Sequence, residues 1–280
     1  MPLVPTASLV AAAAARGNAV AAFNVITIEH AEAIASGAEQ AGRPAILQIS
    51  HNAVRFHGSL APIAAGAAAV AAGSGAQLAL HLDHVEDAAL LHQAADTGFS
   101  SAMFDAGALP YDENVRATAA AAEWAHGAGL WLEAELGYVG GKPDAPANAH
   151  AAGVRTDPDE ARAFVAATGV DALAVAVGSS HAMTSRTATL DRDLIAALRT
   201  SVPVPLVLHG SSGVPDDELR GAVAAGMAKI NVGTALNIAF TGAVRSSLAQ
   251  LDSSDPRKYL APARAAMAAV VADLLRIVSG

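Results

Sequence analysis

Short runs of β-type apolar residues alternate with longer helical patterns along the chain. This alternation is the signature of a parallel sheet whose strands are joined by crossover helices. We predict eight strands, at Val20–Asn24, Ala45–Ser50, Gln77–Asp83, Ser100–Asp105, Leu130–Leu136, Ala172–Gly178, Val204–His209 and Ala228–Val232. The helical patterns between them include Ile28–Ala41, Val85–Thr97, Asp112–Gly129, Pro158–Thr168, Asp191–Thr200 and Pro215–Ala225.

Eight strand-then-helix units in one chain are the number that closes a (β/α)8 barrel, the TIM-barrel fold of the α/β class. From Thr234 the pattern predicts one long helix, a turn at Asp252–Pro256 and a final helix that ends near Val278. An open, doubly wound sheet is the alternative, but no Gly-x-Gly-x-x-Gly motif follows the first strand. No stretch resembles a linker, so we predict a single domain over residues 1–280 with extra C-terminal helices.

Composition narrows the class of protein. The 280 residues are 53% hydrophobic and 15% charged, which indicates a substantial core. The net charge is −9 and the 17 Lys and Arg residues are scattered, so we expect no nucleic-acid partner. The uncharged stretch from Ser59 to Leu80 contains Pro62, Gln77 and much alanine, so we expect no membrane span. Because cysteine and a basic, apolar leader are absent, we exclude thiolate chemistry and predict a cytoplasmic protein.

Polar residues gather at the carboxyl ends of the predicted strands, where barrels of this type carry their chemistry. We therefore expect these side chains to surround one barrel mouth. They are Asn24, Ser50, His81, Asp83, His84, Asp105, Glu133, Glu135, His181, His209, Lys229 and Asn231.

Three of these histidines predict a metal site. His84, His181 and His209 follow the third, sixth and seventh strands, so they can converge on one point above the barrel. Three imidazoles with an open fourth position form the usual catalytic zinc site, and imidazole without thiolate suits zinc better than magnesium or calcium. Glu135 is either a fourth ligand or a residue that orients one. Taken singly, each histidine could instead be a hydrogen-bonded residue at a strand end.

Asp83 precedes a predicted ligand directly, so its carboxylate could move a proton at a substrate oxygen or orient an imidazole. His81 shares the strand face of Asp83, and we interpret it as an inner residue with a satisfied hydrogen bond. The remaining histidines fall in loops or helices and are interpreted as surface residues: His30, His51, His57, His92, His126 and His150.

Two glycine-containing loops predict a phosphate site. Gly210-Ser211-Ser212-Gly213 follows the seventh strand, and Asn231-Val232-Gly233-Thr234 leads from the eighth strand into a helix. Loops after strands 7 and 8, together with a helix N-terminus, are where such barrels hold phosphate. The alternative is a pair of ordinary tight turns.

Several segments together resemble the class II, metal-dependent ketose-bisphosphate aldolases, in particular the tagatose- and fructose-bisphosphate branch. The resemblance runs over nearly the whole chain in the same order. The segments are Ala22-Phe23-Asn24, His81-Leu82-Asp83-His84, Glu133-Ala134-Glu135-Leu136-Gly137, Leu173–Gly178, Leu208–Gly213, Lys229-Ile230-Asn231-Val232 and Asp255-Pro256-Arg257.

The resemblance implies cleavage of the C3–C4 bond of a ketose (bis)phosphate to dihydroxyacetone phosphate and an aldehyde. It implies that zinc polarises the C2 carbonyl, that Asp83 handles the C4 hydroxyl proton, and that Asn231 lies near the reacting carbon. A monovalent cation near the phosphate and a homodimer or homotetramer are further expectations. Ser50 and Arg257 are implied for the far phosphate, with Arg257 supplied by a neighbouring subunit. The dihydroxyacetone-phosphate half is implied to be held by Asn24, Gly210, Ser211, Ser212, Asn231, Gly233 and Thr234.

The sequence departs from the family pattern at two places. Ala182 stands where the family has glycine after the second zinc histidine, and Lys142-Pro143-Asp144 stands where a loop glutamate would move the C3 proton. We predict that Asp144 takes that proton. The alternatives are a Schiff-base aldolase that uses Lys229, a zinc hydrolase, and a sugar-phosphate binder without catalysis.

Overall fold

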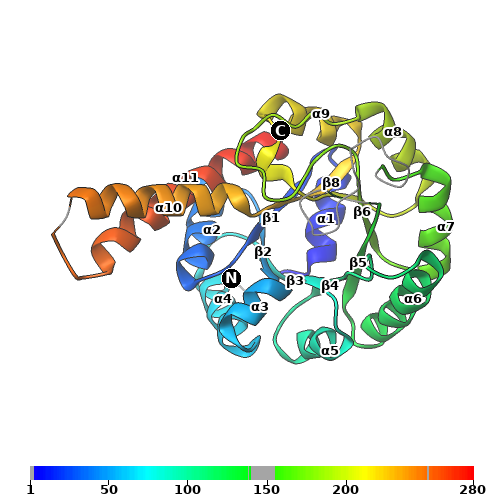
Figure 1. Ribbon diagram of the computed structural model, residues 1–280, viewed down its shortest axis with the longest axis horizontal. Coiled ribbons are helices and arrows are strands. Elements are labelled where there is room, and N and C mark those ends of the chain that lie inside the picture. Colours follow the sequence, from blue (N-terminus) through cyan, green and yellow to red (C-terminus); the bar gives the residue numbers. More distant parts are fainter. Residues whose placement is uncertain (1–2, 138, 140–154, 251) are drawn as a thin grey trace.

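The computed structural model describes residues 3–137, 139, 155–250 and 252–280. Within these residues eight parallel strands close a barrel in chain order, and β8 pairs with β1 (Figure 1). The predicted (β/α)8 fold is therefore confirmed. The strands are β1 Val20–Asn24, β2 Ala45–Ser50, β3 Leu78–Val85, β4 Ser101–Phe104, β5 Trp131–Leu136, β6 Ala172–Val175, β7 Leu206–Leu208 and β8 Met227–Val232.

Helices surround the barrel and cover the outer face of the strands (Figure 1). Phe23 and Leu47 point outwards and form one buried apolar cluster with Ile34 and Leu91 of the covering helices. Burial on both faces explains why the strands are almost continuously apolar. The helices are α1 Thr6–Ala14, α2 Ile28–Ala41, α3 His51–His57, α4 Ala61–Gly73, α5 Ala88–Asp96, α6 Tyr111–Gly127, α7 Pro158–Thr168, α8 Arg192–Ser201, α9 Asp216–Ala225, α10 Thr234–Gln250 and α11 Arg257–Val278.

Helix α1 closes the amino-terminal end of the barrel. Leu9 and Val10 pack against inward-facing Val20 and Ile46. The sequence pattern did not predict α1, because its N-terminus has no capping side chain and its alanines give no clear alternation of apolar and polar faces. Helices α3 and α4 were also missed.

The carboxyl ends of four strands differ from the prediction. β3 continues to Val85, whereas β4 already ends at Phe104, β6 at Val175 and β7 at Leu208. His209 therefore lies just beyond its strand, where Gly210 turns the chain with a φ of 67°. The predicted ligand remains at the carboxyl end of the barrel.

Helices α10 and α11 form an arm that projects from one side of the barrel (left in Figure 1). α11 returns along α10 and packs against α2. The predicted C-terminal helices are confirmed. Among the described residues, no single helix is long and apolar enough to span a membrane. Taken together, α3 and α4 are long and apolar enough to span a membrane, but the two helices are bent by 113° where they meet.

Candidate metal centre at the barrel mouth

The barrel brings together the four residues that the sequence proposed as ligands. One donor atom each from His84, Glu135, His181 and His209 lies within 4.8 Å of the others. The imidazole centroids are 4.9 Å apart for His84 and His209 and 5.4 Å apart for His84 and His181. These residues follow or belong to β3, β5, β6 and β7, so the cluster depends on closure of the barrel.

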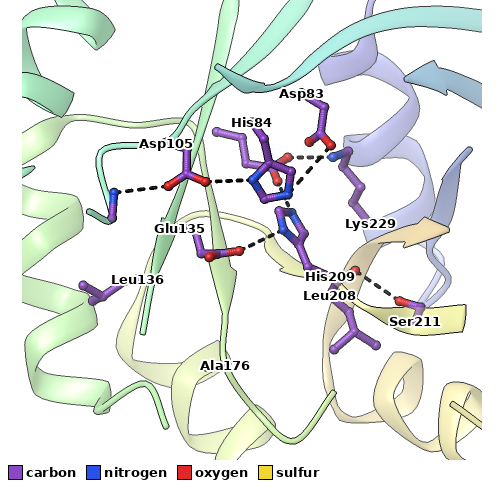
Figure 2. Close-up of polar contacts among 12 residues, drawn as sticks. Asp83, His84, Asp105, Glu135, Leu136, Ala176, Leu208, His209, Ser211 and Lys229 are labelled. Carbon is purple, nitrogen blue, oxygen red and sulfur yellow. Dashed lines mark hydrogen bonds and ion pairs between the residues drawn. The ribbon is translucent and has the colours of Figure 1, made fainter. Parts of the chain in front are cut away.

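His84 is held at the rim of the barrel by the carboxylate of Asp105, the residue that follows β4. Its Nδ1 lies 2.8 Å from Oδ2 of Asp105, and Oδ1 of Asp105 accepts a hydrogen bond from the Gly107 amide (Figure 2). Burial alone would lower the pKa of His84, but Asp83 and the bond to Asp105 raise it above its usual value. The pairing with Asp105 leaves Nε2 of His84 directed at the cluster.

His209 is held inside the barrel. Its Nε2 lies 2.8 Å from Oε1 of Glu133, and its Nδ1 lies 2.9 Å from Oε2 of Glu135. Nζ of Lys229 donates to the other oxygen of Glu133 at 2.7 Å. Burial opposes a charge on His209, but the contacts with Glu133 and Glu135 raise its pKa to about 9. A metal ion must therefore displace a proton to bind Nδ1 of His209.

Two residues of the cluster region have an unusual backbone. Among the described residues other than glycine, only His84 and Ala182 have positive φ, at 50° and 58°. Such conformations are strained for residues with a Cβ and often occur at functional sites. The glycine that the family resemblance implies at position 182 would adopt this backbone without that strain.

Asp83 is almost completely buried beside the cluster and is held by a residue that the sequence analysis missed. The amide of Gln48 donates to Oδ2 of Asp83 at 3.0 Å and to Oδ1 of Asn24 at 2.8 Å. Oδ2 of Asp83 also lies 3.8 Å from Nε2 of His84. The signal for Gln48 was present in the sequence, because it lies two residues before Ser50 on the inward face of β2.

The interpretation of His81 is confirmed, whereas that of His30 is wrong. His81 is fully buried, and its Nδ1 lies 2.8 Å from the Ser101 hydroxyl. Burial and the charge of Lys229 hold the pKa of His81 well below its usual value. His30 is not on the surface. It completes the capping box of α2 with Thr27 and stacks on Phe240.

The two predicted phosphate loops lie next to each other. The Ser212 hydroxyl accepts a hydrogen bond from the amide of Ala235, in the first turn of α10, at 3.0 Å. A Cβ at Gly210 would lie 2.6 Å from the carbonyl carbon of Ser180, so only glycine fits there. The Ser211 hydroxyl is turned inwards and donates to the carbonyl of Leu208 (Figure 2). These contacts join the loops after β6, β7 and β8.

Asn231 and Asn24, which the family resemblance assigns to substrate binding, also lie at this mouth of the barrel. Asn231 is buried at the end of β8, and its side-chain amide has no hydrogen-bond partner in the part of the chain that the structure describes. A Cβ at Gly233 would lie 2.8 Å from Nδ2 of Asn24. Asn24 and the loop before Thr234 are therefore in close contact.

Two further proposed site residues make hydrogen bonds outside this group. The Ser50 hydroxyl caps α3 by accepting from the amide of Ala53 at 3.2 Å. Arg257 begins α11 at the far end of the arm, where it pairs with Asp255 at 2.9 Å and its side chain is 88% exposed. Asp144, with Lys142 and Pro143, lies outside the described residues.

The sequence matches the class II fructose-bisphosphate aldolase family over residues 4–280. The chain belongs to this family. Its members are aldolases, which are carbon–carbon lyases. The family resemblance inferred from the motifs is therefore confirmed, and the barrel mouth described above is the candidate active site of a class II aldolase.

Solved aldolase structures cover almost the same length of chain. The YdjI aldolase from Escherichia coli K12 is 30% identical, with a TM-score of 0.86 over 99% of this chain and 97% of its own. A protein described as a fructose-1,6-biphosphate aldolase, from Coccidioides immitis, is 28% identical, with a TM-score of 0.87 over 98% and 96% of the two chains. Both support the fold and the family.

The residues present fit the metal ion that class II aldolases typically require. Three imidazoles and a carboxylate supply four donors close enough to share one ion. His84 and His209 each pair through one ring nitrogen with a carboxylate, which directs the other nitrogen at the cluster. The described residues contain one such group of metal-ligating side chains, and it lies where this fold carries its chemistry.

Proposed function

We propose that this class II aldolase uses zinc to cleave and form the C3–C4 bond of a ketose phosphate. The products of cleavage would be dihydroxyacetone phosphate and an aldehyde. The observation that carries the proposal is the cluster of His84, His181, His209 and Glu135 beside the buried carboxylate of Asp83. Imidazole donors without thiolate favour zinc over magnesium or calcium.

The role of the ligand residues would be to hold an ion that acts as a Lewis acid. His84, His181 and His209 would hold the ion, with Glu135 as a fourth donor. When bound, the ion would supply a Lewis acid for the C2 carbonyl of the substrate. Asp105 and Glu133 would keep two of the imidazoles in place, because each accepts a hydrogen bond from the ring nitrogen that does not bind the ion.

Asp83 would take the proton of the C4 hydroxyl in the cleavage direction. Gln48 donates a hydrogen bond to Oδ2 of Asp83, whereas Oδ1 of Asp83 has no hydrogen-bond partner among the described residues. As the C3–C4 bond breaks, its electron pair passes towards C2 and C3, and the C4 oxygen becomes the carbonyl oxygen of the aldehyde. Asp83 returns the same proton in the condensation direction. The transfer of the C3 proton by Asp144 stays a prediction.

The loops after β7 and β8 would hold the phosphate of the dihydroxyacetone half. Thr234 begins α10, so its first turn presents backbone amides and a partial positive charge to an anion. Ser212 is fixed to this turn by Ala235, and Gly233 allows Asn24 to approach it closely. This arrangement favours a phosphorylated sugar over an uncharged one. A monovalent cation beside the phosphate stays a prediction.

A Schiff-base mechanism is the weaker alternative. Lys229 is fully buried, and Glu133 holds its ammonium group at 2.7 Å. A nucleophilic amine must be free to reach a carbonyl, and the contact with Glu133 holds the Lys229 amine inside the barrel. The contacts of Lys229 therefore favour a structural role.

A second copy of the chain would complete the site for a bisphosphate. Arg257 is exposed and begins α11. The arm that α10 and α11 form projects away from the barrel (Figure 1). Ile238 and Leu248 are exposed large apolar residues on α10. We propose that the arm packs against another subunit in a homodimer or homotetramer and delivers Arg257 to it. The cytoplasmic location stays a prediction.

A cleavage screen would test the proposed function. The protein loaded with zinc would be incubated with ketose monophosphates and bisphosphates of each C4 configuration, and triose phosphate would be detected with a coupled dehydrogenase. We expect release from at least one ketose, and release that is slower by roughly 10²–10⁴ from Asp83→Ala loaded with the same metal. A zinc-loaded wild-type protein that releases no triose phosphate from the whole panel would contradict the proposal.

A further inference from the structure

The interior of the barrel contains a charged pair that the proposed reaction does not use. Lys229 on β8 and Glu133 on β5 are both fully buried, and Nζ lies 2.7 Å from Oε2. β5 and β8 are not neighbours in the barrel, so this contact crosses its interior. Neither side chain reaches solvent, and neither belongs to the group of metal-ligating residues.

Stability alone does not explain this pair. Removing two charges from water is costly, and packed apolar residues of similar size are often as stable as a buried ion pair or more stable. Apolar residues would fit the surroundings, because inward-facing neighbours such as Ala172, Ala174 and Val207 are apolar. The pair therefore needs a role that apolar side chains could not perform.

Glu133 connects the pair to the metal cluster. While Oε2 is bound to Lys229, Oε1 lies 2.8 Å from Nε2 of His209. An ionised carboxylate only accepts hydrogen bonds, so Nε2 must carry the proton in this contact. The other nitrogen, Nδ1, faces Glu135, and a metal ion that displaces the proton held there would bind its lone pair.

Lys229 determines which oxygen of Glu133 is available. A carboxylate alone could rotate and bind His209 through either oxygen, or turn towards His81, whose Nε2 lies 4.0 Å from Oε2. The ammonium group of Lys229 fixes Oε2 and leaves Oε1 for His209. The imidazole is thereby held in one orientation and one tautomer.

We infer that Lys229 and Glu133 are a positioning pair, which fixes the ring of His209 and sets how tightly the site holds its metal ion. This inference rests on the proposed metal dependence, but it concerns affinity for the ion and not the chemical step.

Metal affinity of the full-length protein would test the inference. The dissociation constant for Co²⁺ would be measured by competition with a chelator, and the visible absorption of bound Co²⁺ would report the arrangement of its ligands. For Glu133→Leu combined with Lys229→Met, which removes both charges, we expect affinity to fall by roughly 10–100-fold, the usual effect of losing such a partner. The absorption bands should also shift. Glu133→Gln keeps an acceptor for His209, so its loss should be smaller.

Ser101→Ala is the matched control, because it removes a buried hydrogen bond to His81 in the same interior without touching a proposed ligand. We expect its affinity and spectrum to be those of the wild type. A folded double variant with wild-type affinity and spectrum would overturn the inference, and so would an equal loss in Ser101→Ala. If the wild type binds Co²⁺ but cleaves no ketose phosphate, the proposed function fails while the inference on the pair is still decided.

Discussion

His84 and His209 contribute to the same cluster, but the protein holds them by different means. His84 lies at the rim with its side chain 22% exposed, and its partner Asp105 is fixed by a backbone amide. His209 is fully buried, and its partner Glu133 needs the charge of Lys229. Close to solvent, a carboxylate can orient an imidazole with little further support. In the interior, the same device requires a counter-charge, because an unpaired buried carboxylate is very unfavourable.

The backbone differs between the two regions as well. On the rim side, His84 and Ala182 adopt strained positive φ values. On the interior side, Glu133 and Lys229 lie within regular strands, and strain is replaced by side-chain pairing. The rim therefore relies on backbone shape, whereas the interior relies on buried charge.

Removal of a ligand should have the largest effect and should separate the two regions. Chelation should abolish activity, and zinc or cobalt should restore it. His209→Ala and His84→Ala should each lose most bound metal, as measured by elemental analysis. His209→Ala should also destabilise the metal-free fold by about 1–3 kcal/mol, because Oε1 of Glu133 loses its buried partner. Denaturant unfolding should show a smaller loss for His84→Ala. Full activity in a metal-free sample, or equal destabilisation by both variants, would contradict this view.

Asp83 should affect turnover rather than metal content. Asp83→Ala should lower kcat by roughly 10²–10⁴, the usual range for a positioned acid–base group, and should keep the metal. Steady-state kinetics of the metal-loaded variant would measure the loss. If the variant instead loses zinc, Asp83 belongs with Asp105 and Glu133 as a residue that orients the ligands.

Gln48 should act through Asp83 and have a smaller effect. Gln48→Leu removes the amide that donates to Asp83 and Asn24 while it keeps a side chain of similar length. Loss of a hydrogen bond to a charged group typically costs about 1.5–3 kcal/mol, so we expect kcat to fall by about 10–100-fold. A kcat equal to that of the wild type would show that Gln48 only fills space.

Arg257 lies outside both regions and should affect one class of substrate. If it binds the far phosphate in a neighbouring subunit, Arg257→Ala should raise KM by about 10–100-fold for a bisphosphate and hardly change it for a monophosphate. Lys258→Ala is a control at the next position. Equal effects on both substrates, or none on either, would remove this role.

Ala182 should give the smallest effect and test the strain on the rim. Ala182→Gly removes the Cβ from a residue with a φ of 58°. Relief of strain should outweigh the added chain entropy, so we expect the free energy of unfolding to rise by up to about 1 kcal/mol. Denaturant unfolding of the metal-free protein would measure it, and Ala188→Gly, on the same loop, should be destabilising. A loss of stability in Ala182→Gly would show that position 182 is not strained.

Much of this protein could be predicted from local sequence. The strands were recognisable because both faces of each are buried and apolar, and their polar residues stand at the carboxyl ends. His84, His181 and His209 could be proposed as one site because a closed barrel brings all its strand ends to one mouth. The arm was predicted from the helical pattern after Thr234 and the turn before Arg257.

Other features were decided by the tertiary structure alone. Alternation along β2 places Gln48 inside the barrel, but only closure of the sheet brings its amide to Asp83. Nothing in the sequence pairs Glu133 with Lys229, since 96 residues separate them and their strands are not adjacent. Helix α1 has no side-chain cap, and it is held by packing against the open end of the barrel. Local pattern thus determines which elements form and where their polar ends lie, whereas partners across the interior depend on strand order and register.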